Sequence, residues 1–361
     1  MKQAIFLINL NQDVAVSRPV ARFFRREGLL DIVFLITAPF RKRDKSGLWF
    51  GEVMELTQEL QGEAIEVDEA VDAVRALAGR SGLILSASES ALSAHDFAHA
   101  VFLGAPPTVT RITLQHGLEC VGFNHNAAHN QTFRHFIGMA GDVAASWFEI
   151  DALHSIQPDQ LAKTIPVGPP IALEAPPATA AHRRLRRYDV EVHGLVCENL
   201  HSVRFGEHDR SSFVAHLLSF ARQMEANNGT LELRPHPGGR YLEKNKAPLP
   251  ANVVMNRSPL YKQSLDKFAF CISGASSVVF DMVWAGVPVA VWGSRERGVD
   301  VGIYSSLTFV STEQEWLDFA LSASRNPEPF LKIQAEYIDR LRLPPDIPER
   351  YRRLAELAHG S

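Results

Sequence analysis

Long apolar runs and cysteine are scarce in this sequence. No apolar stretch reaches the roughly 18 residues that a membrane-spanning helix needs, and the opening MKQAIFLINLNQD is too short and lacks the cleavage site of a signal peptide. The three cysteines, Cys120, Cys197 and Cys271, are odd in number and widely spaced, which indicates reduced thiols rather than a disulfide framework. These absences predict a cytoplasmic protein.

The chain also lacks an excess of charge of either sign. Its 37 Lys and Arg residues nearly balance its 41 Asp and Glu residues, and the net charge of -4 gives no reason to expect a nucleic-acid partner. Basic clusters do occur at residues 41–45 and 183–187. Either cluster is suited to rest against an anionic membrane surface, and the alternative is an ordinary solvated face or linker.

The length and composition are those of a globular protein with two domains. Of the 361 residues, 46% are hydrophobic and 22% charged. Short apolar runs alternate with segments of helical period, a pattern typical of βαβ units and parallel sheets. We expect strands at residues 4–10, 32–37, 82–86, 108–115, 143–147, 165–168, 190–197, 230–234, 268–273 and 287–292.

A Pro- and Ala-rich stretch at residues 169–181 has the composition of a linker. We therefore predict an N-terminal domain at residues 1–175, a C-terminal domain at 176–340 and a helical tail at 341–361. Each domain is expected to be α/β, doubly wound and Rossmann-type, and the two are expected to face each other across a cleft. Such sheets bind ligands beyond the carboxyl ends of their strands, so the residues that follow strands are the candidate site residues.

The first candidate motif is RPHPGG, at the end of the expected strand TLEL. Pro237 favours extended backbone at His236, and the two prolines stiffen the exit from the strand. Arg234 is suited to hold a phosphate or carboxylate, and a fixed His236 beside it is suited to assist a leaving phosphate. The alternative is a structural turn with a satisfied histidine.

The second motif, SGASS, ends the expected strand FAFCI and precedes a helical segment. Ser276 or Ser277 is a good helix N-cap, and the free N–H groups of the helix start would attract a phosphate. Ser273 begins the motif. The alternative is a cap with no further role.

The third motif is QHGLE, which follows the expected strand TRITL. Gly117 permits a close backbone approach, and the polar groups of Gln115, His116 and Glu119 would form the opposite wall of a cleft. A well-packed turn is the alternative. The segment at residues 9–13, after the first strand, is also expected to face an acceptor, although a solvated loop has the same composition.

Taken together, QHG, RPHP and SGASSVVFDMVWAGVPVAVW resemble the motifs of bacterial GT-B fold transferases that use cytidine-activated donors. These include Kdo transferases of capsule and lipopolysaccharide, sialyl- and polysialyltransferases, and CDP-glycerol glycerophosphotransferases. The resemblance covers mainly the second domain and one loop of the first. It implies a GT-B fold with an acceptor-side N-terminal domain and a donor-binding C-terminal domain.

In those families the His-Pro and Ser-Ser motifs hold cytidine monophosphate. We predict that six residues bind the donor nucleotide and its phosphate, namely Arg234, His236, Ser273, Ser276, Ser277 and Gln115. The chain lacks the Trp that some glycerophosphotransferases carry between Gln and His, and the acidic Gly motif of several sialyltransferases is not evident. The resemblance therefore favours a Kdo transferase.

The catalytic groups are expected among carboxylates and histidine. A retaining transferase needs a carboxylate as nucleophile or cation stabiliser and a second acid or base, which favours Glu198, after the strand EVHGLVC, with Glu119 as its partner. Ordinary loop glutamates are the alternative for both. If the reaction inverts the anomeric centre, one carboxylate or His116 would serve as the base.

No metal or other cofactor is expected. No two Asp residues lie two positions apart, so the D-x-D metal grip of another glycosyltransferase fold is missing. His125 and His129 have the spacing of a helical zinc pair, but a third ligand is not evident.

The sequence thus predicts a metal-independent glycosyltransferase that moves Kdo, or a related acidic sugar, from a CMP-activated donor to a bacterial surface polysaccharide. Its partners would be the nucleotide sugar and a glycan or glycolipid acceptor, with peripheral contact to the inner membrane or other synthase components as a further option. Two alternatives remain open on the same fold. One is a glycerophosphotransferase, UDP-sugar transferase or epimerase, and the other is a non-catalytic protein that binds nucleotide sugars.

Overall fold

The computed structural model describes residues 2–125, 128–129, 131, 137–175, 192–202, 204–237, 239–293 and 302–360. The chain forms two compact units. The N-terminal domain comprises Met1–His125, Phe133–Ala175 and Arg342–Ser361, and the C-terminal domain comprises Asn126–Thr132 and Pro176–Leu341. The second basic cluster, at 183–187, and residues 176–181 of the predicted linker lie outside the described residues. None of the described helices is both long and apolar enough to cross a membrane.

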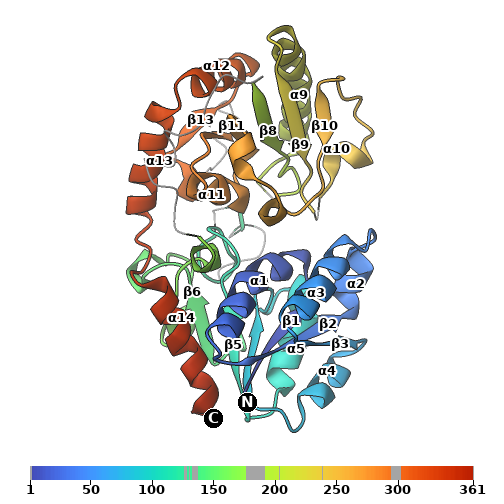
Figure 1. Cartoon of the computed structure of the whole chain (residues 1–361), viewed down its shortest axis with the longest axis vertical. Coiled ribbons are helices and arrows are strands. Elements are labelled where there is room, and N and C mark those ends of the chain that lie inside the picture. The colour runs from blue at the N-terminus through green and yellow to red at the C-terminus, as the bar shows by residue number, and fades with distance from the viewer. Residues whose placement is uncertain are drawn as a thin grey trace. The chain divides into compact units, whose positions relative to one another are not determined.

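The N-terminal domain is built on a sheet whose strands β1, β2, β3, β5 and β6 are labelled in Figure 1. The described strands are parallel and run in the order β3-β2-β1-β4-β5-β6-β7. The strands are β1 (Gln3–Ile8), β2 (Asp31–Thr37), β3 (Glu63–Val67), β4 (Gly82–Ser86), β5 (Val109–Leu114), β6 (Val143–Ser146) and β7 (Thr164–Pro166). The central strands are continuous apolar runs because both faces of a parallel sheet are covered by helices. The strand order reverses between β1 and β4.

Helices cover both faces of this sheet, as the right-handed crossovers of a doubly wound fold require. They are α1 (Asn11–Arg26), α2 (Ala38–Arg43), α3 (Leu48–Glu59), α4 (Ala70–Leu77), α5 (Asp96–Gly104), α7 (Pro158–Leu161) and α14 (Ile347–Glu356). Helices α4 and α5 pack on the core formed by β1, β2 and β4. The last helix, α14, belongs to this domain, where the Tyr351 hydroxyl donates to the Gly168 carbonyl oxygen at 3.1 Å.

The C-terminal domain repeats the plan with described strands in the order β10-β9-β8-β11-β12-β13, all parallel. They are β8 (His193–Cys197), β9 (Thr230–Arg234), β10 (Val253–Met255), β11 (Phe270–Gly274), β12 (Val289–Trp292) and β13 (Thr308–Val310). The helices are α9 (Glu207–Ala226), α10 (Tyr241–Lys244), α11 (Ser277–Trp284), α12 (Glu313–Arg325) and α13 (Glu328–Arg340). Here the order reverses between β8 and β11.

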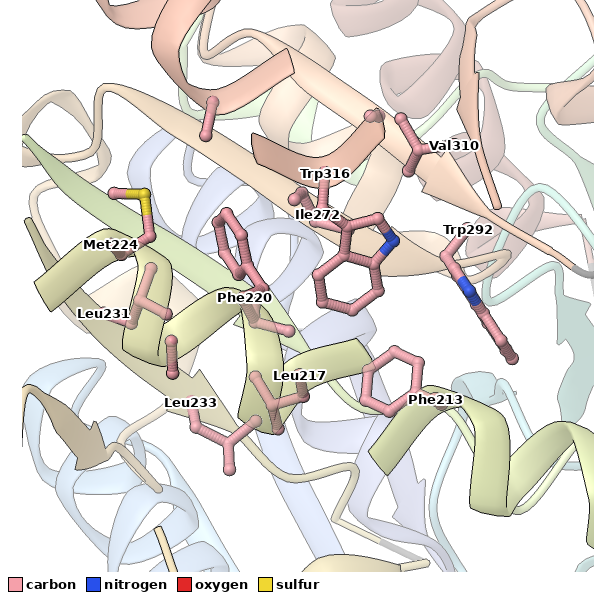
Figure 2. Close-up of a cluster of buried hydrophobic side chains, with 14 of the residues drawn as sticks. Phe213, Leu217, Phe220, Met224, Leu231, Leu233, Ile272, Trp292, Val310 and Trp316 are labelled. Atoms are coloured by element: carbon pink, nitrogen blue, oxygen red, sulfur yellow. The ribbon is translucent and has the colours of Figure 1, made fainter. Parts of the chain in front are cut away.

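The core of this domain lies between the sheet and helices α9 and α12 (Figure 2). Helix α9 buries a stripe at helical spacing, made of Phe213, Leu217, Phe220 and Met224. The Trp316 ring of α12 meets Phe213 and Phe220 edge-on, with ring centroids 5.4 and 5.5 Å apart. Such edge-to-face pairs stabilise a core by roughly 1 kcal/mol beyond the apolar area they bury. The predicted fold class of two doubly wound parallel α/β domains is confirmed.

Candidate functional site

At the carboxyl edge of the C-terminal sheet, one residue of the RPHP motif and one of the SGASS motif lie on the same row, that is, on one line of residues that are paired across neighbouring strands. Arg234 of β9 lies opposite Cys197 of β8, and Cys197 lies opposite Ser273 of β11. Because neighbouring strands are about 4.8 Å apart, Arg234 and Ser273 are separated by roughly 10 Å. The strand order reverses between β8 and β11, so this row lies at the position where doubly wound sheets bind ligands.

His236 lies directly beyond β9 and stacks on His201 from the loop after β8, with ring centroids 3.7 Å apart. Burial lowers the pKa of His236 well below its usual value of 6.5, and the nearby His201 and Arg234 add to the effect. The ring is therefore neutral at neutral pH. A Cβ on Gly239 would lie 2.8 Å from the His201 Cβ, so glycine is needed for this stack. Gly238 lies outside the described residues.

Arg234 is buried, with 8% of its surface exposed, and its Nη1 donates to the Ser258 carbonyl oxygen. Burial lowers the pKa of Arg234, but a guanidinium stays charged at any physiological pH. On α11, burial raises the pKa of Asp281 to about 7, an effect that the nearby charge of Arg234 partly opposes. The edge of the sheet therefore carries a fixed positive charge beside a carboxyl group that is only partly ionised at neutral pH.

The SGASS segment connects β11 to α11, and Ser276 is the N-cap of the helix. Its backbone is extended, and its side chain makes no capping hydrogen bond. The Ser273 hydroxyl donates to the Gly274 carbonyl oxygen at 2.7 Å and lies 3.5 Å from the Ser276 hydroxyl. The first N–H groups of α11, starting at Ser277, carry the positive end of the helix dipole and suit an anion.

The Glu198 side chain fixes the start of helix α10. It is 2% exposed, and its carboxylate accepts hydrogen bonds from the backbone N–H groups of Tyr241 and Leu242, the latter at 3.1 Å. Burial raises the pKa of Glu198, and these two bonds lower it in part. The carboxylate thus holds the start of α10, directly after the RPHPGG loop. Its catalytic role stays a prediction, and any such role would require it to leave these bonds.

Asn199 was not expected among the site residues. It follows Glu198, and its Nδ2 donates to the Ala275 carbonyl oxygen in the SGASS segment. The bond joins the loops after β8 and β11 across the point where strand order reverses. The only sequence signal was its position directly after a predicted strand.

Gln115 lies in the N-terminal domain, whereas the other five predicted donor-binding residues lie in the C-terminal one. Its Nε2 donates to the Gly117 carbonyl oxygen at 2.7 Å, and its Oε1 accepts from the Trp147 backbone N–H at 2.8 Å. The Trp147 indole N–H donates to its main-chain oxygen, also at 2.8 Å. The structure therefore shows Gln115 joining the ends of β5 and β6, and donor binding by it stays a prediction.

His116 is oriented by the loop after β4. Its Nδ1 lies 2.8 Å from the Ala87 carbonyl oxygen and 3.2 Å from the Cys120 Sγ. A carbonyl oxygen only accepts hydrogen bonds, so Nδ1 carries the proton and Nε2 the lone pair. Burial lowers the pKa of His116. A neutral, oriented imidazole with an unprotonated Nε2 has the properties of a general base.

Glu119 lies in the turn after His116 and is half-buried. It belongs to the N-terminal domain and Glu198 to the C-terminal domain, so the predicted carboxylate pair does not form within either domain. The pairing stays a prediction.

The carboxyl edge of the N-terminal sheet also holds buried polar residues that the motifs did not reveal. The Glu89 carboxylate, after β4, meets His99 Nδ1 at 2.6 Å, the Thr113 hydroxyl at 2.5 Å and the Ala140 N–H at 3.0 Å. Ser88, beside it, bonds to Asp13 of α1. Among the described side chains, no three His, Cys, Asp or Glu residues are arranged to hold a metal ion.

Comparison with known proteins identifies the fold of this chain. No family model and no curated protein sequence matches the chain. Solved structures do match along its length. A structure of S. aureus MnaA with UDP has a TM-score of 0.61 at 11% identity, covering 100% of this chain and 97% of that one. The wall teichoic acid polymerase TagF has a TM-score of 0.59 at 12% identity, covering 99% and 88%.

MurG from Acinetobacter baumannii is also similar, with a TM-score of 0.52 at 12% identity over 99% of this chain and 100% of that one. These proteins have the GT-B fold, and the likeness shows that this chain has it too. At such low identity the likeness does not extend to a donor or an acceptor.

Proposed function

We propose that this chain is a glycosyltransferase whose C-terminal domain binds a nucleotide-sugar donor and whose N-terminal domain binds the acceptor. The row at the carboxyl edge of the C-terminal sheet carries this proposal. Arg234, the adjacent His236 and the start of α11 lie at one switch point. A guanidinium, an imidazole and uncapped helix N–H groups together suit the phosphate of a nucleotide.

The organisation of the acidic groups around this row supports an anionic ligand. Glu198 has its carboxylate directed at the backbone N–H groups of α10, whose hydrogen bonds stabilise its negative charge there. Asp281 has a raised pKa of about 7, so close to half of it is uncharged at neutral pH. Arg234, on the row itself, carries a fixed positive charge.

For the donor we propose a cytidine-linked acidic sugar such as Kdo, and for the acceptor a bacterial surface polysaccharide. The support is the resemblance of the QHG, RPHP and SGASS motifs, since two of them lie on the row described above. We propose that the reaction needs no metal. We also propose peripheral contact with the inner membrane or with other synthase components, since such a polysaccharide is assembled at that membrane.

For the chemistry we favour His116 over Glu198 as the group that moves a proton, because Glu198 already holds two backbone N–H groups. In an inverting transfer, the acceptor hydroxyl gives its proton to His116 Nε2 and its oxygen bonds to the anomeric carbon. The bond from that carbon to the donor phosphate oxygen breaks, and the electron pair leaves with the nucleotide. His236 and the α11 start would stabilise the phosphate that departs.

A uridine-linked donor is the second candidate, because the similar structures include MnaA with UDP and an epimerase bound to UDP-GlcNAc. On the same fold, TagF is a wall teichoic acid polymerase, which keeps the glycerophosphotransferase alternative open. The identity of the base in the nucleotide separates these candidates.

Thermal-shift titrations of the full chain with CMP, CDP, UMP and UDP test the proposal. A ligand at 100 times its dissociation constant stabilises the folded state by about 2.7 kcal/mol. We expect a CMP-selective rise in Tm that is lost in His236→Ala. The matched control is His193→Ala, since His193 is at the other end of the same sheet, bonded to Thr230 and Glu232.

A uridine preference would refute the cytidine donor and favour the second candidate. No shift with any of the four nucleotides would refute the donor site itself. If CMP binds but CMP-Kdo is not consumed with any glycan acceptor, the chain is a non-catalytic binding protein instead.

A further inference from the structure

The segment at residues 9–13 comprises the link from β1 to α1 and the first turn of α1, at the switch point of the N-terminal sheet. It is no solvated loop. Asn9 and Asp13, at its two ends, are 0% exposed, and the three residues between them are each partly exposed. Two polar side chains are therefore buried where doubly wound sheets place their ligands.

In the described part of the chain, the hydrogen bonds to the Asp13 carboxylate reach one of its two oxygens. Its Oδ2 accepts the backbone N–H groups of Asn9 and Leu10 at 2.8 and 2.7 Å and the Ser88 hydroxyl at 2.5 Å. The two backbone bonds cap the start of α1, as an acidic residue in the first turn commonly does. Oδ1 is buried and has no hydrogen-bond partner among the described residues.

Two further side-chain atoms of the same segment are buried, and the residues that the structure describes supply no hydrogen-bond partner for them. They are the Nδ2 of Asn9, whose Oδ1 accepts from the Thr37 hydroxyl at 3.2 Å, and the Oδ1 of Asn11. Buried polar atoms are satisfied in the great majority of cases, and leaving one unsatisfied destabilises a protein. Three within five residues point to a ligand that the segment is built to receive.

The chemistry of these atoms identifies the ligand class. One N–H donor and two oxygen acceptors complement neighbouring hydroxyl groups, each of which both donates and accepts. A carboxylate repels a phosphate or a second carboxylate. This edge therefore differs from the C-terminal one, where Arg234 and the start of α11 suit an anion.

We propose that residues 9–13 form a subsite for the hydroxyl groups of a neutral carbohydrate, with Asp13 Oδ1 accepting from one hydroxyl and Asn9 Nδ2 donating to another. This rests on the proposed function, in which the N-terminal domain binds the acceptor. The ligand reaches both atoms by shifting the partly exposed residues between them. Asp13 binds the acceptor, and the proton of the reacting acceptor hydroxyl passes to His116.

The loop after β4 links this subsite to His116, the proposed general base. Ser88 donates to Asp13, and Ala87, directly before it, accepts from His116. Consecutive residues of one short loop thus orient both side chains. A hydroxyl held by Asp13 is then held in fixed relation to the imidazole that would take its proton.

Crystals grown with a mixture of neutral methyl glycosides provide the direct test, which needs no nucleotide. We expect a sugar hydroxyl within hydrogen-bond distance of Asp13 Oδ1 and Asn9 Nδ2. A water molecule or nothing at that position, with glycosides bound elsewhere or not at all, would overturn the proposal.

Thermal shifts with the same glycosides provide the second measurement. The stabilisation should be smaller in Asp13→Asn than in the unchanged protein. Asp44→Asn is the matched control, because Asp44 is also a buried aspartate of this domain that accepts a backbone N–H, from Phe50 at 2.7 Å, and a serine hydroxyl, from Ser46 at 3.1 Å. Equal shifts in all three proteins would contradict the subsite. A subsite that fails while CMP still binds leaves the proposed donor site standing.

Discussion

Replacing Asp13 by Asn should make the protein respond differently to pH. Burial raises the pKa of Asp13 from 3.8 to about 6, although its hydrogen bonds to Ser88 and the backbone oppose the rise. The folded state therefore holds a proton that the unfolded chain releases at lower pH. The associated stability is complete below pH 4 and is lost as the pH rises through 6.

The magnitude follows from the size of this shift. Two pKa units correspond to about 3 kcal/mol of unfolding free energy between the acidic and neutral limits. About half of that loss falls between pH 5 and pH 7.5, a range in which both proteins can be handled. The Asn side chain keeps an oxygen for the N–H groups of Asn9 and Leu10, so the variant retains the helix cap.

Urea denaturation gives the unfolding free energies of the unchanged protein and of Asp13→Asn across this pH range. The contributions of all other titrating groups cancel in the difference between the two proteins. The free energy of unfolding of the unchanged protein should fall by about 1.5 kcal/mol relative to Asp13→Asn between pH 5 and pH 7.5. Glu63→Gln is the control for the sign of the pH dependence. The Arg80 side chain lowers the pKa of Glu63, so the stability that this ion pair contributes is lost as the pH falls. If the difference in unfolding free energy between the unchanged protein and Asp13→Asn stays constant between pH 5 and pH 7.5, the pKa of Asp13 is not raised by burial and the reasoning is refuted.

Three further predictions concern other parts of the molecule. Because burial lowers the pKa of His116, the transfer rate should fall only in solutions more acid than those that protonate an ordinary histidine. His116→Asn should reduce kcat by about 100-fold or more in a turnover assay. Gly239→Ala should displace His201 and weaken CMP binding about fivefold, roughly 1 kcal/mol, in a calorimetric titration. Phe220→Ala should remove a ring from the C-terminal core and lower the unfolding free energy by about 3 to 5 kcal/mol in urea.

The fold was predictable because buried parallel strands are continuous apolar runs. The strands of both sheet centres follow this rule and were expected close to their observed positions. The strands that the sequence did not reveal are β3, β10 and β13, which lie at sheet edges. Two of them have three residues each, and β3 reads Glu-Ala-Ile-Glu-Val, because an edge strand has less of its surface to bury. Helix α1 begins at Asn11, and the side chain that caps it is Asp13 rather than a residue before the helix.

The candidate site was predictable to the extent that it depends on strand ends. Arg234 and Ser273 follow from the rule that parallel strands end at one edge, and pairing through β8 places them on one row. The role of Glu198 does not follow from that rule. Its partners, Tyr241 and Leu242, lie 43 and 44 residues further along the chain, and no local pattern reports such contacts.

Asp13 shows why a correct local pattern leaves the function open. An acidic residue in the first turn of a helix is explained by capping alone, and that explanation accounts for the bonds to Asn9 and Leu10. It does not account for burial, since a capping carboxylate is normally solvated and keeps a low pKa. One of the groups around the buried carboxylate is Ser88, 75 residues away, which the pairing of β1 with β4 brings against it. A cap needs one oxygen, so the second buried oxygen is the part of the residue that a ligand has to explain.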